Sequence, residues 1–300
     1  MANTLHIRQN EDVILKCLVA QRKLYTCAKY WSYVPMIIVA VMAIIVLFSS
    51  SIGSVFTGET WVSAIITFFL WVIAFAGEQY VGNLKLKASR IQQYIDREIF
   101  KEAFSPQQLI LWRDVPSSGE LAEAIQNVDA EAIQKQHVRD WYSNYSSLSP
   151  QEAVFRSQKE NIRWDWGLRV IMITLMLLAL GAVFIVVIAK VWNLKVCDCL
   201  SALIASTGIG VVVGKLLFRL GLDLYRLTLL NTTASVIEGK LNVAEGVDSE
   251  LLRMQNLIYD HRHQGVLIPD WLYRIRRCSI QQSEDAIAKA HEVLVVREGV

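Results

Sequence analysis

Long uncharged apolar runs, separated by polar segments, dominate the pattern of hydrophobic and polar positions along the chain. Four such runs cover residues 34–48, 61–77, 170–189 and 200–214. A membrane-spanning helix needs about 20 mostly apolar residues, and the third run alone meets this length. The first two runs reach this length when their flanking Ser, Thr and Gly residues are included. The fourth run is the weakest, and the alternative to a membrane span there is a buried core helix. We expect four spans in two hairpins, because an unpaired third span would leave the C-terminus outside.

The distribution of basic residues predicts the orientation of these spans. Residues 49–60 contain no Lys or Arg, and residues 190–199 contain two Lys, whereas the remaining segments hold nearly all other basic residues. Cytoplasmic segments carry an excess of Lys and Arg, so both termini and the central segment are predicted to be cytoplasmic. The predicted segments are a cytoplasmic amphipathic helix at 1–33, two transmembrane hairpins at 34–81 and 170–217, and two helical cytoplasmic segments at 82–169 and 218–300.

Helical periodicity extends through the cytoplasmic segments, which makes the predicted fold an all-α integral membrane protein. Pro106, residues 113–119 and residues 265–269 carry loop signals. The helices expected between these breaks cover residues 84–104, 120–142, 152–169, 218–241, 248–261, 269–277 and 280–296. Three of them are expected to continue the spans downward without a break, namely those at 84–104, 152–169 and 218–241.

Residues 11–30 form a further amphipathic pattern ahead of the first span. One face holds Ile14, Leu18, Gln21, Tyr25 and Ala28. Such a helix either lies along the inner leaflet or packs on the cytoplasmic part. We favour packing, because Gln21 and the nearby Asn10 suggest specific polar partners.

Composition and charge limit the function classes. Apolar residues make up 53% of the 300 residues and charged residues 19%, with a net charge of +2. This excludes a disordered chain and a disulfide-dense scaffold, and it gives no basis for binding bulk nucleic acid. Any recognition of an anion must therefore come from local clusters of Arg and aromatic residues.

No enzyme motif in the sequence is supported by the residues around it, and we expect no catalytic residue, cofactor or metal. Residues 208–215 resemble a phosphate loop only faintly, because Ile209 and Leu216 break the pattern. A stripe of small residues explains this stretch better, and it would let two helices approach closely in lipid. Its members are Ala202, Ser206, Gly210 and Gly214. Their partner is either span three or a neighbouring subunit.

The remaining His and Cys residues give no defined site. His261 and His263 point to different faces of a helix, so we interpret them as a solvated pair and not as metal ligands. Cys197 and Cys199 fall in the predicted outer loop. A Cys-x-Cys pair is poorly placed for one intramolecular bridge, which leaves an intersubunit bond or two free thiols.

Two clusters combine Arg with aromatic residues in the cytoplasmic segments. The first contains Arg156, Gln158, Asn161, Arg163 and Trp164, and the second contains Trp271, Tyr273, Arg274 and Arg277. The simpler interpretation of the first is an aromatic belt above a salt-bridged helix face, with Glu160 pairing Arg163 or Arg156. The functional interpretation is a surface for phosphates and stacked bases. Both clusters could then converge on one anionic ligand.

Three segments together resemble the SMODS-associated four-transmembrane (S-4TM) effector family of bacterial CBASS anti-phage defence. They are Arg8-Gln-Asn with residues 18–25 ahead of the first span, residues 158–165 (Gln-Lys-Glu-Asn-Ile-Arg-Trp-Asp) before the third, and residues 269–272 (Pro-Asp-Trp-Leu). The spacing of the spans also agrees, so the resemblance covers the whole chain. Lys159 stands where the family pattern has Arg.

The resemblance implies an effector of the bacterial inner membrane. A partner nucleotidyltransferase makes a cyclic oligonucleotide on infection, and the effector, expected to be a homo-oligomer, binds it and permeabilises the membrane to abort infection. Because the spans carry almost no internal charge, we expect a poorly selective lesion. The alternatives are a constitutive small channel or transporter subunit, and a membrane scaffold that recruits a cytoplasmic partner.

Overall fold

The computed structural model describes residues 4–48, 60–191, 196–241 and 246–298, and every regular element in these ranges is a helix. Side chains are described for most of these residues, but not for 36, 39–48, 60–64, 66–67, 71, 183, 186–187, 189–191, 196–212 or 291–298. The elements are α1 (Leu5–Arg8), α2 (Asp12–Phe48), α3 (Thr60–Phe100), the 3-10 turn η1 (Lys101–Ala103), α4 (Pro106–Ile110), α5 (Ser118–Ile125), α6 (Ala130–Gln136), α7 (Pro150–Val191), α8 (Val196–Leu241), α9 (Val247–Gln264) and α10 (Asp270–Glu298).

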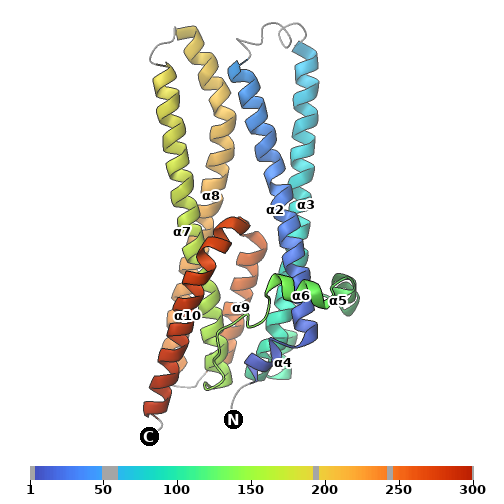
Figure 1. Ribbon diagram of the computed structural model, residues 1–300, viewed down its shortest axis with the longest axis vertical. Coiled ribbons are helices and arrows are strands. Elements are labelled where there is room, and N and C mark those ends of the chain that lie inside the picture. The colour runs from blue at the N-terminus through green and yellow to red at the C-terminus, as the bar shows by residue number, and fades with distance from the viewer. Residues whose placement is uncertain (1–3, 49–59, 192–195, 242–245, 299–300) are drawn as a thin grey trace.

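Four long helices, α2, α3, α7 and α8, run side by side along the length of the molecule (Figure 1). They contain 37, 41, 42 and 46 residues. At 1.5 Å per residue each is about 55–70 Å long, roughly twice the 30 Å hydrocarbon core of a bilayer. Each predicted span therefore continues into the lower part of the molecule without a break, as expected for α3, α7 and α8. The closest pairs are α2 with α3 and α7 with α8.

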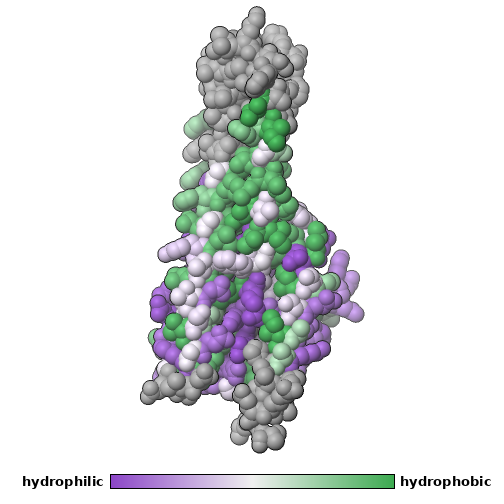
Figure 2. Space-filling model, turned by 90° about the vertical axis from the view of Figure 1, so that its left-hand side faces the viewer, coloured by the Kyte–Doolittle hydropathy of each residue, from purple (hydrophilic) through white to green (hydrophobic). Residues whose placement is uncertain are grey.

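The hydrophobic core lies in the lower half, where α9 packs between the long helices. Apolar side chains fill it from five helices: Leu18 from α2, Ile95 from α3, Phe155 from α7, Leu227 from α8 and Leu251 from α9 are fully or almost fully buried. Figure 2 shows the corresponding surface, with hydrophilic residues gathered on the lower part and an apolar band above. Helix α1 and the end of α10 lie at the lower end (Figure 1).

The apolar band includes a stretch suited to a bilayer. Within the described residues, Pro150–Ala182 is the one helical stretch that is long and apolar enough to cross a membrane, with a mean hydropathy of 1.6 in its best window. Only 11% of that window is buried, so its side chains face outward, as lipid contact requires. The predicted runs at 34–48, 61–77 and 200–214 lie partly or largely among residues whose side chains are not described.

The N-terminal helical segment packs on the core and does not form a separate helix. It is the first half of α2, which continues through Pro35 into the first apolar run. Four members of the predicted face are buried, namely Ile14, Leu18, Gln21 and Ala28, and the fifth, Tyr25, is half-buried. Gln21 Nε2 donates to Gln92 Oε1 (3.0 Å), and Asn10 Nδ2 donates to Asp140 Oδ1 (2.9 Å). These are the specific polar partners that favoured packing over an inner-leaflet position.

Two predicted helix boundaries are wrong. The predicted helix at 120–142 is divided into α5 and α6, because Asp129 caps a new helix by accepting from the Ala132 N–H (2.7 Å) and His137 adopts a left-handed conformation that ends it. In contrast, the predicted helices at 269–277 and 280–296 form one continuous helix, α10. The predicted loop at 190–199 is also shorter, since α7 ends at Val191 and α8 begins at Val196.

Candidate functional site

Residues 158–169 of α7 form the polar centre of the molecule, just below the third apolar run. Ser149, the residue before α7, accepts from the Glu152 N–H (3.3 Å), so the helix begins where its capping signal predicts. Three groups of polar contacts leave this segment toward different elements, and each contains at least one side chain that is almost fully buried. Since buried charges are costly unless paired, these contacts fix α7 relative to its neighbours.

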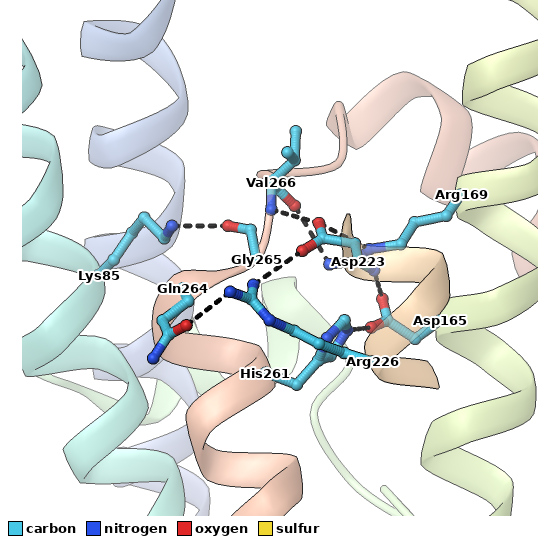
Figure 3. A network of polar contacts seen from close by, with 9 residues as sticks. All are labelled: Lys85, Asp165, Arg169, Asp223, Arg226, His261, Gln264, Gly265 and Val266. Carbon is cyan, nitrogen blue, oxygen red and sulfur yellow. Dashed lines mark hydrogen bonds and ion pairs between the residues drawn. The ribbon is translucent and has the colours of Figure 1, made fainter. Parts of the chain in front are cut away.

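The first group joins four elements at the base of the spans (Figure 3). Arg169, 4% exposed, pairs with Asp165 one turn earlier, and its Nε donates to Asp223 Oδ2 of α8 (3.1 Å). Asp223, 1% exposed, also accepts from the Val266 N–H (2.7 Å), in the loop between α9 and α10. His261 of α9 pairs with the other oxygen of Asp165.

Helix α3 enters the same group through Lys85, whose Nζ donates to the Gly265 carbonyl oxygen (2.6 Å). Arg226 of α8 donates to Asp223 (3.3 Å) and to Gln264 Oε1 (2.6 Å) (Figure 3). The loop at 265–269 is thus held by α3, α7 and α8 together. We call the contacts of Lys85, Asp165, Arg169, Asp223, Arg226, His261 and this loop the membrane-base joint.

Electrostatic interactions in this joint favour the charged form of the Asp165 carboxylate. Burial alone would raise the pKa of Asp165, but the positive charge of Arg169 and the hydrogen bond from His261 lower it well below its usual range. For Lys85, burial lowers the pKa to about 8, and the nearby Asp223 only partly opposes this. The joint therefore holds ionised Asp165 firmly, whereas its lysine is costly to keep charged.

The second group crosses the core below the joint. Gln158 Nε2 donates to Gln255 Oε1 of α9 (3.0 Å), and Gln255 donates to Asp96 Oδ2 of α3 (2.9 Å). Asp96 also accepts from Arg262 Nη1 (2.5 Å) and from the Tyr142 hydroxyl (2.7 Å). Asn161 Nδ2 in turn donates to that hydroxyl (3.0 Å). The negative charge of the buried Asp96 is therefore stabilised by donors from two elements, α9 and the segment before α7.

The third group connects α7 to α10 and to the segment before α7. Arg163 pairs with Glu284 of α10, with Nε 2.8 Å from Oε1. Glu160 is buried and accepts from the Ser143 N–H (3.2 Å), and pairs with neither Arg163 nor Arg156. Burial raises the pKa of Glu160 to about 7; the Ser143 N–H opposes this rise and the negative charge of Glu284 adds to it.

The second predicted cluster lies on the first turns of α10, and it meets the first cluster at one contact. The rings of Trp164 and Tyr273 stack with centroids 5.5 Å apart. Trp271, 49% exposed, and Arg274 face solvent, whereas Arg277 Nη2 donates to the His137 carbonyl oxygen (3.2 Å). Helix α10 begins beside α2, because Asp270 pairs with Lys29.

The predicted ligand residues therefore separate into two sets. Trp164 and Tyr273 stack where α7 meets α10, and Trp271 and Arg274 are exposed on the same first turns of α10; we call this region the α7–α10 face. Gln158 is buried in the core and the half-buried Asn161 donates to the Tyr142 hydroxyl, whereas Arg156 pairs with Glu152 and with Glu238 of α8 (3.3 Å each). The salt-bridged helix face expected in the simpler interpretation is present, although its partners lie mostly on other helices.

The interpretation of His261 and His263 as a solvated pair is wrong for His261, which is buried against Asp165. Sequence reasoning also missed Asp96, Asp223 and Arg262. A signal for Asp223 existed, since it is an acid inside the apolar pattern of α8. Among the described residues, no group of three His, Cys, Asp or Glu side chains lies close enough to hold a metal ion.

Two predictions fall largely outside the described side chains. Of the small-residue stripe, Ala202, Ser206 and Gly210 lie in α8 without described surroundings, and so do Cys197 and Cys199. Gly214 is described, and a Cβ placed there would meet no atom within 4 Å. Among the described residues, the lower end of the stripe therefore has no close contact with another helix.

Comparison with known proteins gives one match. The family model of the SMODS-associating 4TM effector domain matches residues 3–292, nearly the whole chain. No curated protein and no solved structure matches. The match includes the membrane-base joint, both Arg/aromatic clusters and all four apolar runs.

Proposed function

The chain belongs to the SMODS-associating 4TM effector family, a family of membrane effectors linked to SMODS-type signalling, and from this premise we propose its mechanism. It binds a cyclic oligonucleotide on its cytoplasmic part and permeabilises the bacterial inner membrane. The observation that supports this most is the continuity of α3, α7 and α8 from the polar lower part into the apolar band. A ligand that moves the lower part must move the spans.

The proposed contact surface is the α7–α10 face. Arg274 and Trp271 are exposed there, and Tyr273, on the same turns of α10, stacks on Trp164 of α7. A guanidinium suits a phosphate, and aromatic rings suit bases, so this face offers both kinds of contact that a cyclic oligonucleotide requires. Arg163 is reached only if the ligand displaces Glu284, and Gln158 and Asn161 support the fold behind the face.

Transmission from this face follows the contacts of α10. Tyr273 and Glu284 connect α10 to α7, and Asp270 connects it to Lys29 of α2. A ligand shifts an equilibrium only by binding one conformation better than another. A ligand that binds better to a displaced α10 therefore biases α7 and α2, which carry the third and first apolar runs.

The proposed outcome is a lesion with little ion selectivity. The apolar runs carry no charged residue, so rings of charge that would select ions are not available in them. The ligand is supplied by a partner nucleotidyltransferase, and the effector itself performs no catalysis. These proposals place the protein downstream of an enzyme that makes the second messenger.

Thermal unfolding against a panel of cyclic di- and trinucleotides tests the binding step. We expect one panel member to raise the melting temperature of the detergent-solubilised chain. Trp271→Ala and Arg274→Ala should each weaken its affinity by about tenfold or more. Arg253→Ala, at an exposed position of α9, is the matched control and should bind as the parent does. Equal affinity of Arg274→Ala and the parent would contradict the proposed surface.

A further inference from the structure

Helix α8 presents a second apolar seam on the side that faces away from its own chain. Its residues follow a strict spacing of four and three, which repeats every seven positions, and all are exposed. Five of them are apolar, namely Phe218, Leu222, Tyr225, Leu229 and Val236, and Thr232 and Gly239 complete the spacing. Phe218 and Tyr225 are 68% and 69% exposed. We call these seven residues the outer seam.

The opposite face of α8 shows what such a seam does when it is covered. Leu220, Leu227, Leu230, Ala234 and Ile237 are almost fully buried and follow the same three-and-four spacing. They pack against α7, α9 and α2. Apolar residues repeating at this spacing are the pattern by which helices pair side by side. Helix α8 therefore has two packing faces, and one chain uses only one of them.

Lipid cannot cover the lower part of the outer seam. A span of about 20 residues from Val196 ends near residue 216, and Lys215 pairs there with Glu78 (2.6 Å). At 1.5 Å per residue, Tyr225 lies about 14 Å and Val236 about 30 Å beyond that level. The large apolar side chains from Leu222 to Val236 therefore repeat over about four turns in water, and an exposed apolar surface of this kind marks an interaction site.

The geometry favours an identical helix as the partner. We propose that the outer seam pairs with the outer seam of a second copy of this chain. All copies inserted in one membrane have the same orientation, so their α8 helices are parallel, and a two-fold axis places like residues against like. The exposed apolar side chains sum to roughly 1,000 Å² over two copies, which is at the lower limit for a biological interface.

A column of small residues beside the seam supports close approach of the two helices. Gly214, Gly221, Thr228 and Ser235 are each seven residues apart, and all are exposed. Thr228 and Ser235 donate to carbonyl oxygens one turn earlier in α8 (2.9 and 3.1 Å), so their hydroxyls need no partner outside the helix. The column begins at the last residue of the predicted small-residue stripe, so it extends that stripe below the membrane.

The inference deepens the proposed function, because it rests on the chain being a membrane effector, and it needs neither ligand nor leakage for its test. In membranes without nucleotide, Thr232→Cys should give a covalent dimer with a short bis-maleimide. Asn231→Cys, one position off the seam and also exposed, is the control. We expect several-fold more dimer for Thr232→Cys; equal yields would overturn the proposal.

A second variant tests the energy of the seam. Leu229→Glu places a charge on the seam, and Ile110→Glu places one on an exposed apolar position of α4. The parent and Ile110→Glu should have the mass of at least two chains in mild detergent, and Leu229→Glu should have the mass of one. Retention of the parental mass by Leu229→Glu would contradict the proposal. Because assembly is measured directly, its failure is distinguishable from failure of nucleotide binding.

Discussion

The two Arg/aromatic clusters have similar sequences but different environments. On α7, Arg163 of the first cluster and the nearby Arg169 each pair with a buried carboxylate, and on α10 Trp271 and Arg274 face solvent. The two clusters therefore have different roles, although their amino-acid compositions are similar. The α7 cluster holds helices together at the base of the spans, and the α10 cluster is available to a ligand. Substitutions in the two clusters should therefore differ in their effects on stability and binding.

The largest effect on stability is expected at Arg169. Arg169→Met leaves Asp223 and Asp165 without their shared cation, and breaking a buried ion pair costs about 3–5 kcal/mol. The free energy of unfolding in detergent should fall by that order. Arg219→Met, at an exposed position of the same membrane level, should change it little. Equal losses in the two variants would show that the membrane-base joint does not stabilise the molecule.

Glu160 should make stability depend on pH. Its pKa is raised from 4.5 to about 7, so between these values the folded state binds more protons than the unfolded state, and stability falls as pH rises. The loss between pH 5 and 8 is on the order of 3 kcal/mol.

Glu160→Gln removes this proton and keeps an acceptor for Ser143, so melting temperatures measured from pH 5 to 8 should vary less than those of the parent. The exposed Glu131→Gln is the control and should keep the parental profile. A profile of Glu160→Gln identical to that of the parent would argue against a protonated Glu160 in the folded state.

An intermediate effect is expected at Gly265, in the loop held by the joint. A Cβ there would lie 2.6 Å from the His261 carbonyl oxygen and 2.7 Å from Arg169 Nη2. Gly265→Ala should therefore cost about 1–3 kcal/mol, as forced overpacking does. At Gly82, in α3, a Cβ meets nothing within 4 Å, so Gly82→Ala should be neutral or slightly stabilising. Chemical denaturation of both variants gives the comparison, and a neutral Gly265→Ala would be unexpected.

The smallest effect on stability is expected in the exposed cluster. Arg274→Ala should leave the free energy of unfolding within about 0.5 kcal/mol of the parent, because it removes no buried contact. Arg163→Ala should cost more, since it leaves the buried carboxylate of Glu284 unpaired. If Arg274→Ala proves the more destabilising of the two, the assigned difference between the clusters is wrong.

Much of the helical framework follows from local patterns in the sequence. The continuation of α3, α7 and α8 was predictable, because no Pro or loop signal interrupts them between the apolar runs and the lower part. The packed face of α2 followed from its periodicity. The division of 120–142 was not predicted, although Asp129 is a good N-cap residue, because the Ala, Glu and Gln content of the segment favoured one long helix.

The candidate site was less accessible to sequence reasoning. Arg163 was predicted as a ligand residue, but its partner Glu284 lies 121 residues further along the chain, and Asp223, the partner of Arg169, lies 54 residues from that arginine. Ion pairs of this separation depend on how helices pack, and local spacing carries no information about it. The same limit explains why the burial of His261 was not predicted. This polar residue is buried only because α9 packs against α7.

Simultaneous measurement of bound nucleotide and released dye tests the central claim most directly. Vesicles of inner-membrane lipids containing the full chain and a trapped dye would be titrated with the cyclic oligonucleotide identified by thermal shift. The account predicts that dye release rises with occupancy, and that Arg274→Ala shifts both curves to higher concentration together. Saturation of the binding site with no release of dye would contradict it.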